Sequence, residues 1–282
     1  MGEQFVVAGR GEVREVAQMR DVRMDRRRDC LLPYFLCGLM LLCLGGCASL
    51  GSFNPATGRQ EFIFVPTSDE VQMGQEVHAR LKSEYQLADK DPRAQRLSRI
   101  GARVAQVSDR QDYEYHFFLL DKDEMNAFTT PGGNVYVFSG LMNKLSSDDQ
   151  LAAVLAHEIG HCAARHTIKK FQAGIGFDFV SSLVSNTLTV NEQVKKLATL
   201  GSEALMNLAV SAYSRQDEYE ADRLGVKYMD LAGFRPQGMV ETFEILAREE
   251  KGGGPPLFLR THPYLPDRIA AVKQEIARLP RD

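Results

Sequence analysis

The sequence contains no tryptophan and few cysteines. Five cysteines occur among its 282 residues, and three of them, Cys30, Cys37 and Cys43, lie in one apolar stretch near the N-terminus. Cys47 follows that stretch, so only Cys162 remains in the rest of the chain. Because a disulfide needs two cysteines, the chain beyond Cys47 forms no internal disulfide, and a small disulfide-stapled fold is excluded.

An excess of positive charge is also missing. Lys and Arg number 34 against 37 Asp and Glu, which gives a net charge of −3 at pH 7. Nucleic-acid-binding proteins need basic surface to neutralise phosphates, so the composition does not favour such a partner. Long apolar runs are absent after residue 44, and we therefore expect no membrane-spanning helix in the body of the chain.

The N-terminus has the pattern of a secretory signal peptide. Three arginines at 26–28 precede an apolar stretch at 31–44, which is short for a membrane span, and two glycines follow it. We predict that residues 1–46 are a signal that is removed, with Met24 as an alternative start. The competing interpretation, a short buried helix, does not explain why arginines precede the apolar stretch and glycines follow it.

The four residues Leu44-Gly45-Gly46-Cys47 resemble the lipobox of bacterial lipoproteins. The resemblance implies cleavage before Cys47, acyl chains on that cysteine and stable anchoring to a membrane. No aspartate follows Cys47 directly, which by analogy with enterobacterial sorting favours the periplasmic face of the outer membrane. We interpret residues 47–66 as the lipidated cysteine and a linker.

Hydrophobic periodicity and turn residues predict a mainly helical domain over residues 67–282 with a small sheet, an α+β fold. A capping pattern precedes the helix predicted from Thr67 and another, at Ser147, precedes the helix that follows it. Strands are predicted at 61–65, 115–120 and 134–138. Helices are predicted at 67–85, from 92 onward, at 151–166, through most of 171–230, at 236–250 and at 266–279, with a flexible segment at 251–256.

One of these helices contains the sequence His157-Glu158-Ile159-Gly160-His161, an H-E-x-x-H pattern. Histidines at positions i and i+4 of a helix point the same way, so both imidazoles can bind one zinc ion. Glu158 lies beside them, placed to take a proton from the attacking water. A coincidental polar helix face is a poor alternative, because two histidines beside the apolar run 153–156 would be half-buried and would need partners.

A catalytic zinc ion needs a third protein ligand. The metzincin pattern fails, because Thr167 stands where its last histidine belongs. A later helical segment supplies Glu218 and Asp222 at i and i+4, of which one can bind zinc while the other accepts the outward N–H of a zinc histidine. Glu220 faces away from Glu218 and is the weaker candidate.

In this order, the motifs resemble the HtpX and CAAX prenyl endopeptidase family of zinc metallopeptidases, which are gluzincins. The segment Asn54-Pro55-Ala56-Thr57-Gly58 and the lipobox match its periplasmic lipoprotein branch, the BepA/LoiP type. Further matching segments are Asn126 to Phe128, Gly132 to Val137, Ser139 to Leu141, Thr261 to Pro263, and Arg268 with Ile269. The resemblance covers about residues 54–280 and implies a zincin-like domain with the sheet beside the H-E-x-x-H helix. It implies one Zn²⁺ per chain. The zinc ligands would be His157, His161 and Glu218, the general base would be Glu158, and Asp222 would accept a hydrogen bond from a ligating histidine.

A lone histidine beside a proline, such as His262, is usually a loop residue. In the family the corresponding segment lies near the metal. His262 could therefore stabilise the oxyanion, with Tyr264 as an alternative donor, or occupy the fourth zinc position and keep the enzyme latent. Cys162 is expected to pack in the core. Three other histidines are expected to be structural or exposed: His78, His116 and His166.

The predicted activity is zinc-dependent hydrolysis of peptide bonds. If Val135, Tyr136 and Val137 form an exposed edge strand, they could bind extended substrate by strand addition, which reads backbone rather than sequence. The alternative is a core strand, and the two roles do not exclude each other. Unfolded or misassembled envelope proteins are then the substrate class, and outer-membrane assembly machinery is a candidate partner. The alternative function is an assembly chaperone or scaffold with a latent zinc site.

Residues 171–184 are apolar and contain two glycines, Gly174 and Gly176. They predict either a buried helix pair or a lid over the active site that is hinged at these glycines.

Overall fold

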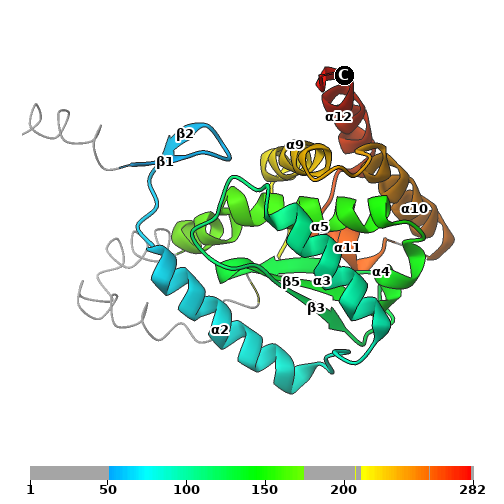
Figure 1. The fold of residues 1–282 in the computed structure, drawn as a ribbon, viewed down its shortest axis with the longest axis horizontal. Helices are drawn as coiled ribbons and strands as arrows, with labels where there is room; N and C mark the ends of the chain where they lie inside the picture. The colour runs from blue at the N-terminus through cyan, green and yellow to red at the C-terminus, as the bar shows by residue number, and fades with distance from the viewer. Residues whose placement is uncertain (1–50, 175–206, 208–210, 254, 281–282) are drawn as a thin grey trace, which may run out of the picture. The chain divides into compact units, whose positions relative to one another are not determined.

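A computed structural model describes residues 51–174, 207, 211–253 and 255–280 (Figure 1). The predicted signal peptide and Cys47 lie outside the described residues, as does the predicted lid beyond residue 174. Within the described residues the fold is α+β and mainly helical with small sheets, as the sequence predicts. None of the described helices is both long and apolar enough to cross a membrane.

The main sheet has three strands in the order β3-β5-β4. The strands are β3 (His116–Leu120), β4 (Ala127–Thr130) and β5 (Asn134–Phe138). β5 runs parallel to β3, with His116 opposite Asn134, and antiparallel to β4, with Ala127 opposite Val137. The prediction of β3 and β5 is confirmed, whereas β4 was not predicted. The turn between β4 and β5 uses Gly132 and Gly133 at φ 75° and 81°, which side chains rarely adopt.

A separate antiparallel hairpin precedes the first helix. It pairs β1 (Ser52–Asn54) with β2 (Arg59–Glu61). The strand predicted at 61–65 is therefore wrong in position, because pairing with β1 ends at Glu61. The turn between the strands is closed by the Gly58 amide, which donates to the Asn54 carbonyl over 2.8 Å.

The predicted helices are present within the described residues. Their bounds, with those of two short helices that were not predicted, α4 and α11, are α2 (Thr67–Glu84), α3 (Pro92–Ala105), α4 (Ser139–Lys144), α5 (Asp148–Ala163), α9 (Arg215–Leu231), α10 (Gln237–Gly253), α11 (Leu257–Thr261) and α12 (Leu265–Arg278). Since α10 continues to Gly253, the first half of the segment predicted to be flexible at 251–256 is helical.

Helix α5 is the centre of the core, lying between the sheet and α9 (Figure 1). Every residue from Gln150 to Ala163 is buried, and the Ser147 hydroxyl caps the helix by accepting the Gln150 amide over 3.1 Å. Gly160 allows the close approach of α9, because a Cβ there would lie 2.8 Å from the Ala221 carbonyl oxygen. The close contact places the first two turns of α9 beside the H-E-x-x-H turns of α5.

Two helix ends differ from prediction. The capping pattern predicted at Thr67 is absent: Pro66 is the N-cap of α2, and Glu70 turns inward to ion pairs with Arg110 and Arg165. α5 ends at Ala163 rather than near residue 166, because Arg165 adopts φ 58° and breaks the helix. Residues 166–174 are helical again after this turn.

Candidate active site

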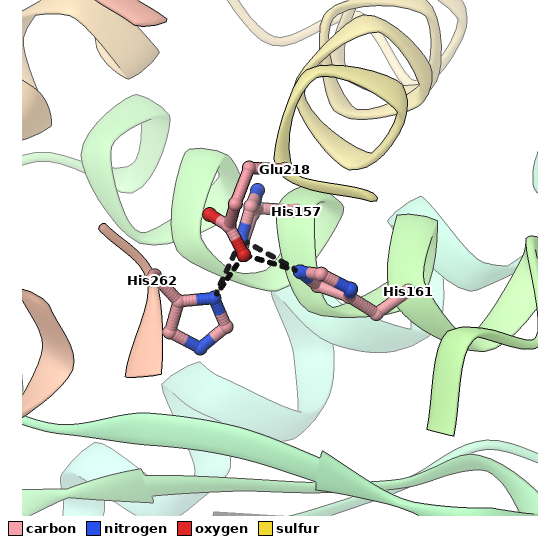
Figure 2. Close-up of side chains that lie close together, drawn as sticks. All are labelled: His157, His161, Glu218 and His262. Atoms are coloured by element: carbon pink, nitrogen blue, oxygen red, sulfur yellow. Dashed lines mark hydrogen bonds and ion pairs between the residues drawn. The ribbon is translucent and has the colours of Figure 1, made fainter. Parts of the chain in front are cut away.

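The H-E-x-x-H histidines face one point from adjacent turns of α5 (Figure 2). Nε2 of His157 and Nε2 of His161 are 3.1 Å apart, and both side chains are buried. Burial lowers the pKa of His161 well below its usual value, so its imidazole is neutral and offers a lone pair. The two histidines are therefore arranged as a pair of metal ligands.

Helix α9 brings Glu218 to the same point. Its first turn is fixed by a capping box in which the side chains of Ser214 and Asp217 each accept the other's backbone amide. Glu218 Oε1 lies 3.4 Å from Nε2 of His161, and Oε2 lies 3.7 Å from Nε2 of His157. Of the two carboxylates offered by the sequence, Glu218 is thus the one placed among the histidines.

His262 completes the group from the C-terminal end of α11 (Figure 2). Its Nδ1 lies 3.1 Å from Nε2 of His157 and 3.1 Å from Oε1 of Glu218. Helix α11 is held there by the Phe258 amide, which donates to the Met125 carbonyl over 2.9 Å, and the Phe258 ring stacks on His262 at 4.4 Å. His262 is wholly buried, so it is a member of the site rather than an ordinary loop residue.

The geometry of this group fits a divalent cation. One ligand atom from each of His157, His161, Glu218 and His262 lies within 4.8 Å of the others. A zinc ion bound at 2.0–2.1 Å by four tetrahedral ligands separates the ligand atoms by about 3.3 Å. With Oε1 as the Glu218 ligand atom, the four separations given above are 3.1–3.4 Å, and the other carboxylate oxygen lies 3.7 Å from Nε2 of His157. Lone pairs that converge in a buried space repel one another unless a cation lies between them, so the donor set is suited to a metal ion.

Glu158 lies beside the ligand group without taking part in it. Its carboxylate is wholly buried, and neither oxygen has a hydrogen-bond partner among the described residues. Nε2 of His262 lies 3.5 Å from Oε1. Burial raises the pKa of Glu158 above its ordinary value. A carboxyl group with a raised pKa and free oxygens is suited to exchanging a proton with a substrate.

Asp222 orients His157, and Arg268, to which the sequence analysis assigned no role, orients both carboxylates. Asp222 Oδ1 accepts from Nδ1 of His157 over 2.9 Å, which leaves Nε2 free to face the ligand group. Arg268 on α12 donates two hydrogen bonds of 2.7 Å to the carboxylate of Asp222 and also forms an ion pair with Oε2 of Glu218. Burial alone would raise the pKa of Glu218, but the charges of Arg268 and His262 and the hydrogen bonds from His161 and His262 together outweigh it and hold that pKa well below the usual range. Two buried carboxylates in one helix need a positively charged side chain as a partner, but the spacing of residues along the sequence does not identify which arginine provides it.

His166 has a role that the sequence did not predict. It is buried, as a structural histidine would be, and its Nδ1 lies 2.9 Å from Nδ1 of His161. Its Nε2 lies 3.2 Å from Oε2 of Glu220, whose carboxylate also accepts from Arg59 over 2.9 Å. Because Nε2 of His161 faces the ligand group, its proton resides on Nδ1 and is donated to His166. Glu220 therefore faces away from the ligand group, as expected, and supports it from behind.

Tyr213 also contacts the ligand group. Its ring stacks on His161 at 3.9 Å between centroids, and its hydroxyl lies 3.0 Å from that of Thr167. Like His166, it fixes the orientation of a histidine. Cys162 is buried with Sγ 2.7 Å from the Thr129 hydroxyl, which confirms its place in the core.

Four residues predicted for the site do not have the expected placement. Val135, Tyr136 and Val137 belong to β5, which is the central strand and is paired on both sides, so they are not an exposed edge. Substrate cannot add to a strand whose backbone groups are already used. Tyr264 is exposed, and its ring lies 4.6 Å from the Arg215 guanidinium, which favours His262 over Tyr264 as the oxyanion donor.

Comparison with known proteins agrees with this geometry. The profile of Peptidase family M48 matches residues 91–276. The beta-barrel assembly-enhancing protease of Escherichia coli K12 is 32% identical over 224 residues, which cover 78% of this chain and 46% of that protein. The mitochondrial metalloendopeptidase OMA1 of Schizosaccharomyces pombe is 31% identical over 227 residues, which cover 79% of this chain and 65% of that protein. The metalloprotease YcaL of E. coli K12 is 29% identical over 202 residues, covering 71% and 76%.

The chain thus spans about half the length of the beta-barrel assembly-enhancing protease that it matches. The family match covers most of the described body, including both helices that carry the ligand group and the His262 segment. The chain belongs to Peptidase family M48.

Proposed function

We propose that the protein is a zinc-dependent endopeptidase that hydrolyses peptide bonds of unfolded or misassembled envelope proteins. The observation that carries the proposal is the buried group of His157, His161 and Glu218 with the unpartnered carboxylate of Glu158 beside it. Family membership supports the same reaction class. One zinc ion per chain held by these three ligands would supply a Lewis acid for the scissile carbonyl and an activated water.

Glu158 is the proton carrier in this proposal. It takes a proton from the attacking water and delivers it to the leaving amine. The absence of competing hydrogen bonds to either oxygen leaves both free for these transfers. Asp222 and Arg268 keep His157 and Glu218 in position while the proton moves.

His262 holds the site latent in this proposal. Its Nδ1 lies among the ligand atoms, at the place of a fourth ligand, while its Nε2 points to Glu158. A catalytic zinc site needs one position for water or substrate, so His262 must leave that position before hydrolysis begins. The oxyanion role remains its alternative, and the direction of the activity change in a His262 variant separates the two.

Because β5 is paired on both sides, we assign substrate binding by strand addition to β4 instead. β4 is an outer strand of the sheet and packs against α5, next to the ligand group. All four residues of β4 are buried, so an extended segment would add to its outer edge only once that edge is uncovered, and it would then be recognised through its backbone. Unfolded or misassembled polypeptides offer such segments, and the name of the beta-barrel assembly-enhancing protease supports an outer-membrane assembly context.

The proposed location is the periplasmic face of the outer membrane. Residues 1–46 would be the signal, Cys47 the lipidated residue, 47–66 the anchor and linker, and 67–282 the peptidase domain. Mass spectrometry of the native N-terminus tests this, and an unmodified residue upstream of Cys47 would contradict it.

The activity is tested with purified full-length mature protein. Zinc content is measured first, and then degradation of an unfolded protein with and without a chelator. About one zinc per chain and chelator-sensitive cleavage are expected. Binding of unfolded protein with no cleavage, in wild type and in His262→Ala alike, would contradict the proposal.

A further inference from the structure

Exposed aromatic side chains gather in one short segment of the protein. Phe53, Phe62 and Phe64 expose 59%, 63% and 52% of their surface. They lie within 12 residues of one another in sequence, on β1 and just after β2. Among the described residues only two other large apolar side chains are exposed, Leu231 and Tyr264. We call the three phenylalanines the aromatic face.

The fold holds the aromatic face outward with specific contacts. On β1, Asn54 is buried and bonds to the Ala163 carbonyl, so the preceding Phe53 points the opposite way. The Gln172 side chain accepts from the Phe64 amide over 2.9 Å and donates to the Phe62 carbonyl over 3.1 Å. The rings of Phe62 and Phe64 lie 6.1 Å apart. The exposure is thus built by hydrogen bonds to a helix and is not the result of an untethered loop.

The aromatic face lies close in sequence to the proposed lipid anchor. Phe53 follows Cys47 by six residues, and an extended chain of that length spans about 20 Å. Acyl chains on Cys47 would therefore keep Phe53 within about 20 Å of the bilayer surface. Aromatic side chains that are exposed next to a membrane anchor find an apolar partner in the lipid interface.

We propose that the aromatic face inserts into the lipid interface and fixes the orientation of the peptidase domain on the membrane. The proposal rests on the proposed lipidation of Cys47 and does not depend on peptidase activity. The orientation matters for the site, because β2 also carries Arg59, whose bond to Glu220 supports the His166–His161 pair. The segment that touches lipid is therefore joined by hydrogen bonds to the ligand group.

The attraction between the aromatic face and the membrane is apolar rather than electrostatic. The basic residues nearest to the aromatic face are already paired: Arg59 with Glu220, Arg165 with Glu70, and Lys169 with Glu61 at 2.6 Å. Arg223, whose guanidinium donates to the Ala56 carbonyl, adds one further positive charge at the hairpin, so in the described part of the chain little free positive charge faces anionic headgroups there. Docking should therefore occur on neutral phosphatidylcholine and should persist at high salt.

The absence of tryptophan allows a direct test. Phe53→Trp, Phe62→Trp and Phe64→Trp each introduce the only tryptophan of the chain, at an exposed position that tolerates the larger ring. Leu231→Trp is the matched control: it is exposed at the end of α9, eleven residues beyond Glu220 and thus about 16 Å along the helix. Each lipidated full-length variant is reconstituted in phosphatidylcholine vesicles, with and without bromine on the acyl chains, and tryptophan quenching is compared.

Bromine should quench the fluorescence at 53, 62 and 64 several-fold more than at 231, with an accompanying blue shift, and high salt should not reverse it. Equal, weak quenching at all positions would overturn the proposal, because a domain that tumbles on its tether has no preferred face. A blue shift without vesicles, which rises with protein concentration, would assign the face to a second copy. A blue shift only on adding unfolded protein would assign it to substrate. Mass spectrometry and a peptide-cleavage assay on the same samples separate a failed anchor or a failed peptidase from a failed docking face.

Discussion

Glu158 differs from Asp222, its acidic neighbour in the site, in accepting no hydrogen bond. Glu218 and Asp222 are held by Arg268, whereas both oxygens of Glu158 are buried and free of hydrogen bonds. Glu158→Gln should therefore keep about one zinc per chain and lower hydrolysis by at least about 100-fold, since it removes a proton carrier and not a ligand. Zinc analysis and cleavage of an unfolded protein check this. Glu218→Ala is the comparison, because it should lose most of the metal, and ordinary cleavage by Glu158→Gln would contradict the mechanism.

His166 acts through His161. The 2.9 Å contact between their Nδ1 atoms fixes the ring that carries a metal-facing nitrogen. His166→Ala should weaken zinc affinity by roughly 10–100-fold, the usual effect of removing the partner of a ligating histidine. Competition with a chelating dye measures it, and the absorption spectrum of the cobalt-substituted protein should change shape. His78→Ala is the control: His78 bonds to the Tyr136 hydroxyl on the other side of the sheet from the ligand group, and it should leave the affinity unchanged.

Nδ1 of His262 lies among the candidate ligand atoms, so removal of this side chain should open a position for water or substrate. We expect His262→Ala to keep zinc through the remaining three ligands and to raise the rate of hydrolysis. A fall in rate with zinc retained would instead assign the histidine to oxyanion stabilisation. A variant identical to wild type in rate and zinc affinity would remove His262 from both roles.

At the scale of elements, a buried ion network joins α2 to the end of α5. Arg110 binds Glu70 through two bonds of 3.0 and 2.8 Å, and Arg165 adds a third at 2.9 Å. Removing one member leaves buried charge without a partner, so Glu70→Ala should lower the free energy of unfolding by about 3–5 kcal/mol. Denaturant unfolding of the metal-loaded protein checks this. Asp69→Ala, which removes the neighbouring exposed carboxylate of the same helix turn, should change it by less than about 0.5 kcal/mol.

The same network shows where local patterns stop being informative. Thr67 to Glu70 has a capping-box sequence, yet Glu70 turns inward because two arginines far along the chain provide stronger partners. α5 and β5 were predictable because their apolar runs and turn residues are contained within the segment itself. β4 and the central position of β5 were not, because strand order depends on pairing between segments. For the same reason the sequence supplied His157, Glu158 and His161 directly, whereas the role of Arg268 beside Glu218 and Asp222 required the three-dimensional structure.

At the scale of the whole molecule, the ligand group connects parts of the chain that are distant in sequence. Its members come from α5, α9 and the end of α11, and Arg268 adds α12. The close packing of α5 on α9 sets the first three ligands, and α11 and α12 close the group from the other side. A cation at this point would therefore stabilise the packing of these helices against one another as well as the site itself.

Metal removal should then destabilise the entire domain. Without a cation, the buried Nε2 atoms of His157 and His161 face each other at 3.1 Å with no charge between them, beside the carboxylate of Glu218. A ligand present at 1,000 times its dissociation constant stabilises a fold by about 4 kcal/mol, which for a domain of this size raises the melting temperature by roughly 10 °C. Thermal unfolding of Glu158→Gln with zinc, with chelator and after zinc is restored measures the effect in a protein that cannot digest itself. Glu218→Ala in the same background should show little response to chelator, and equal melting temperatures with and without zinc in Glu158→Gln would mean that the group does not hold the helices together through a metal.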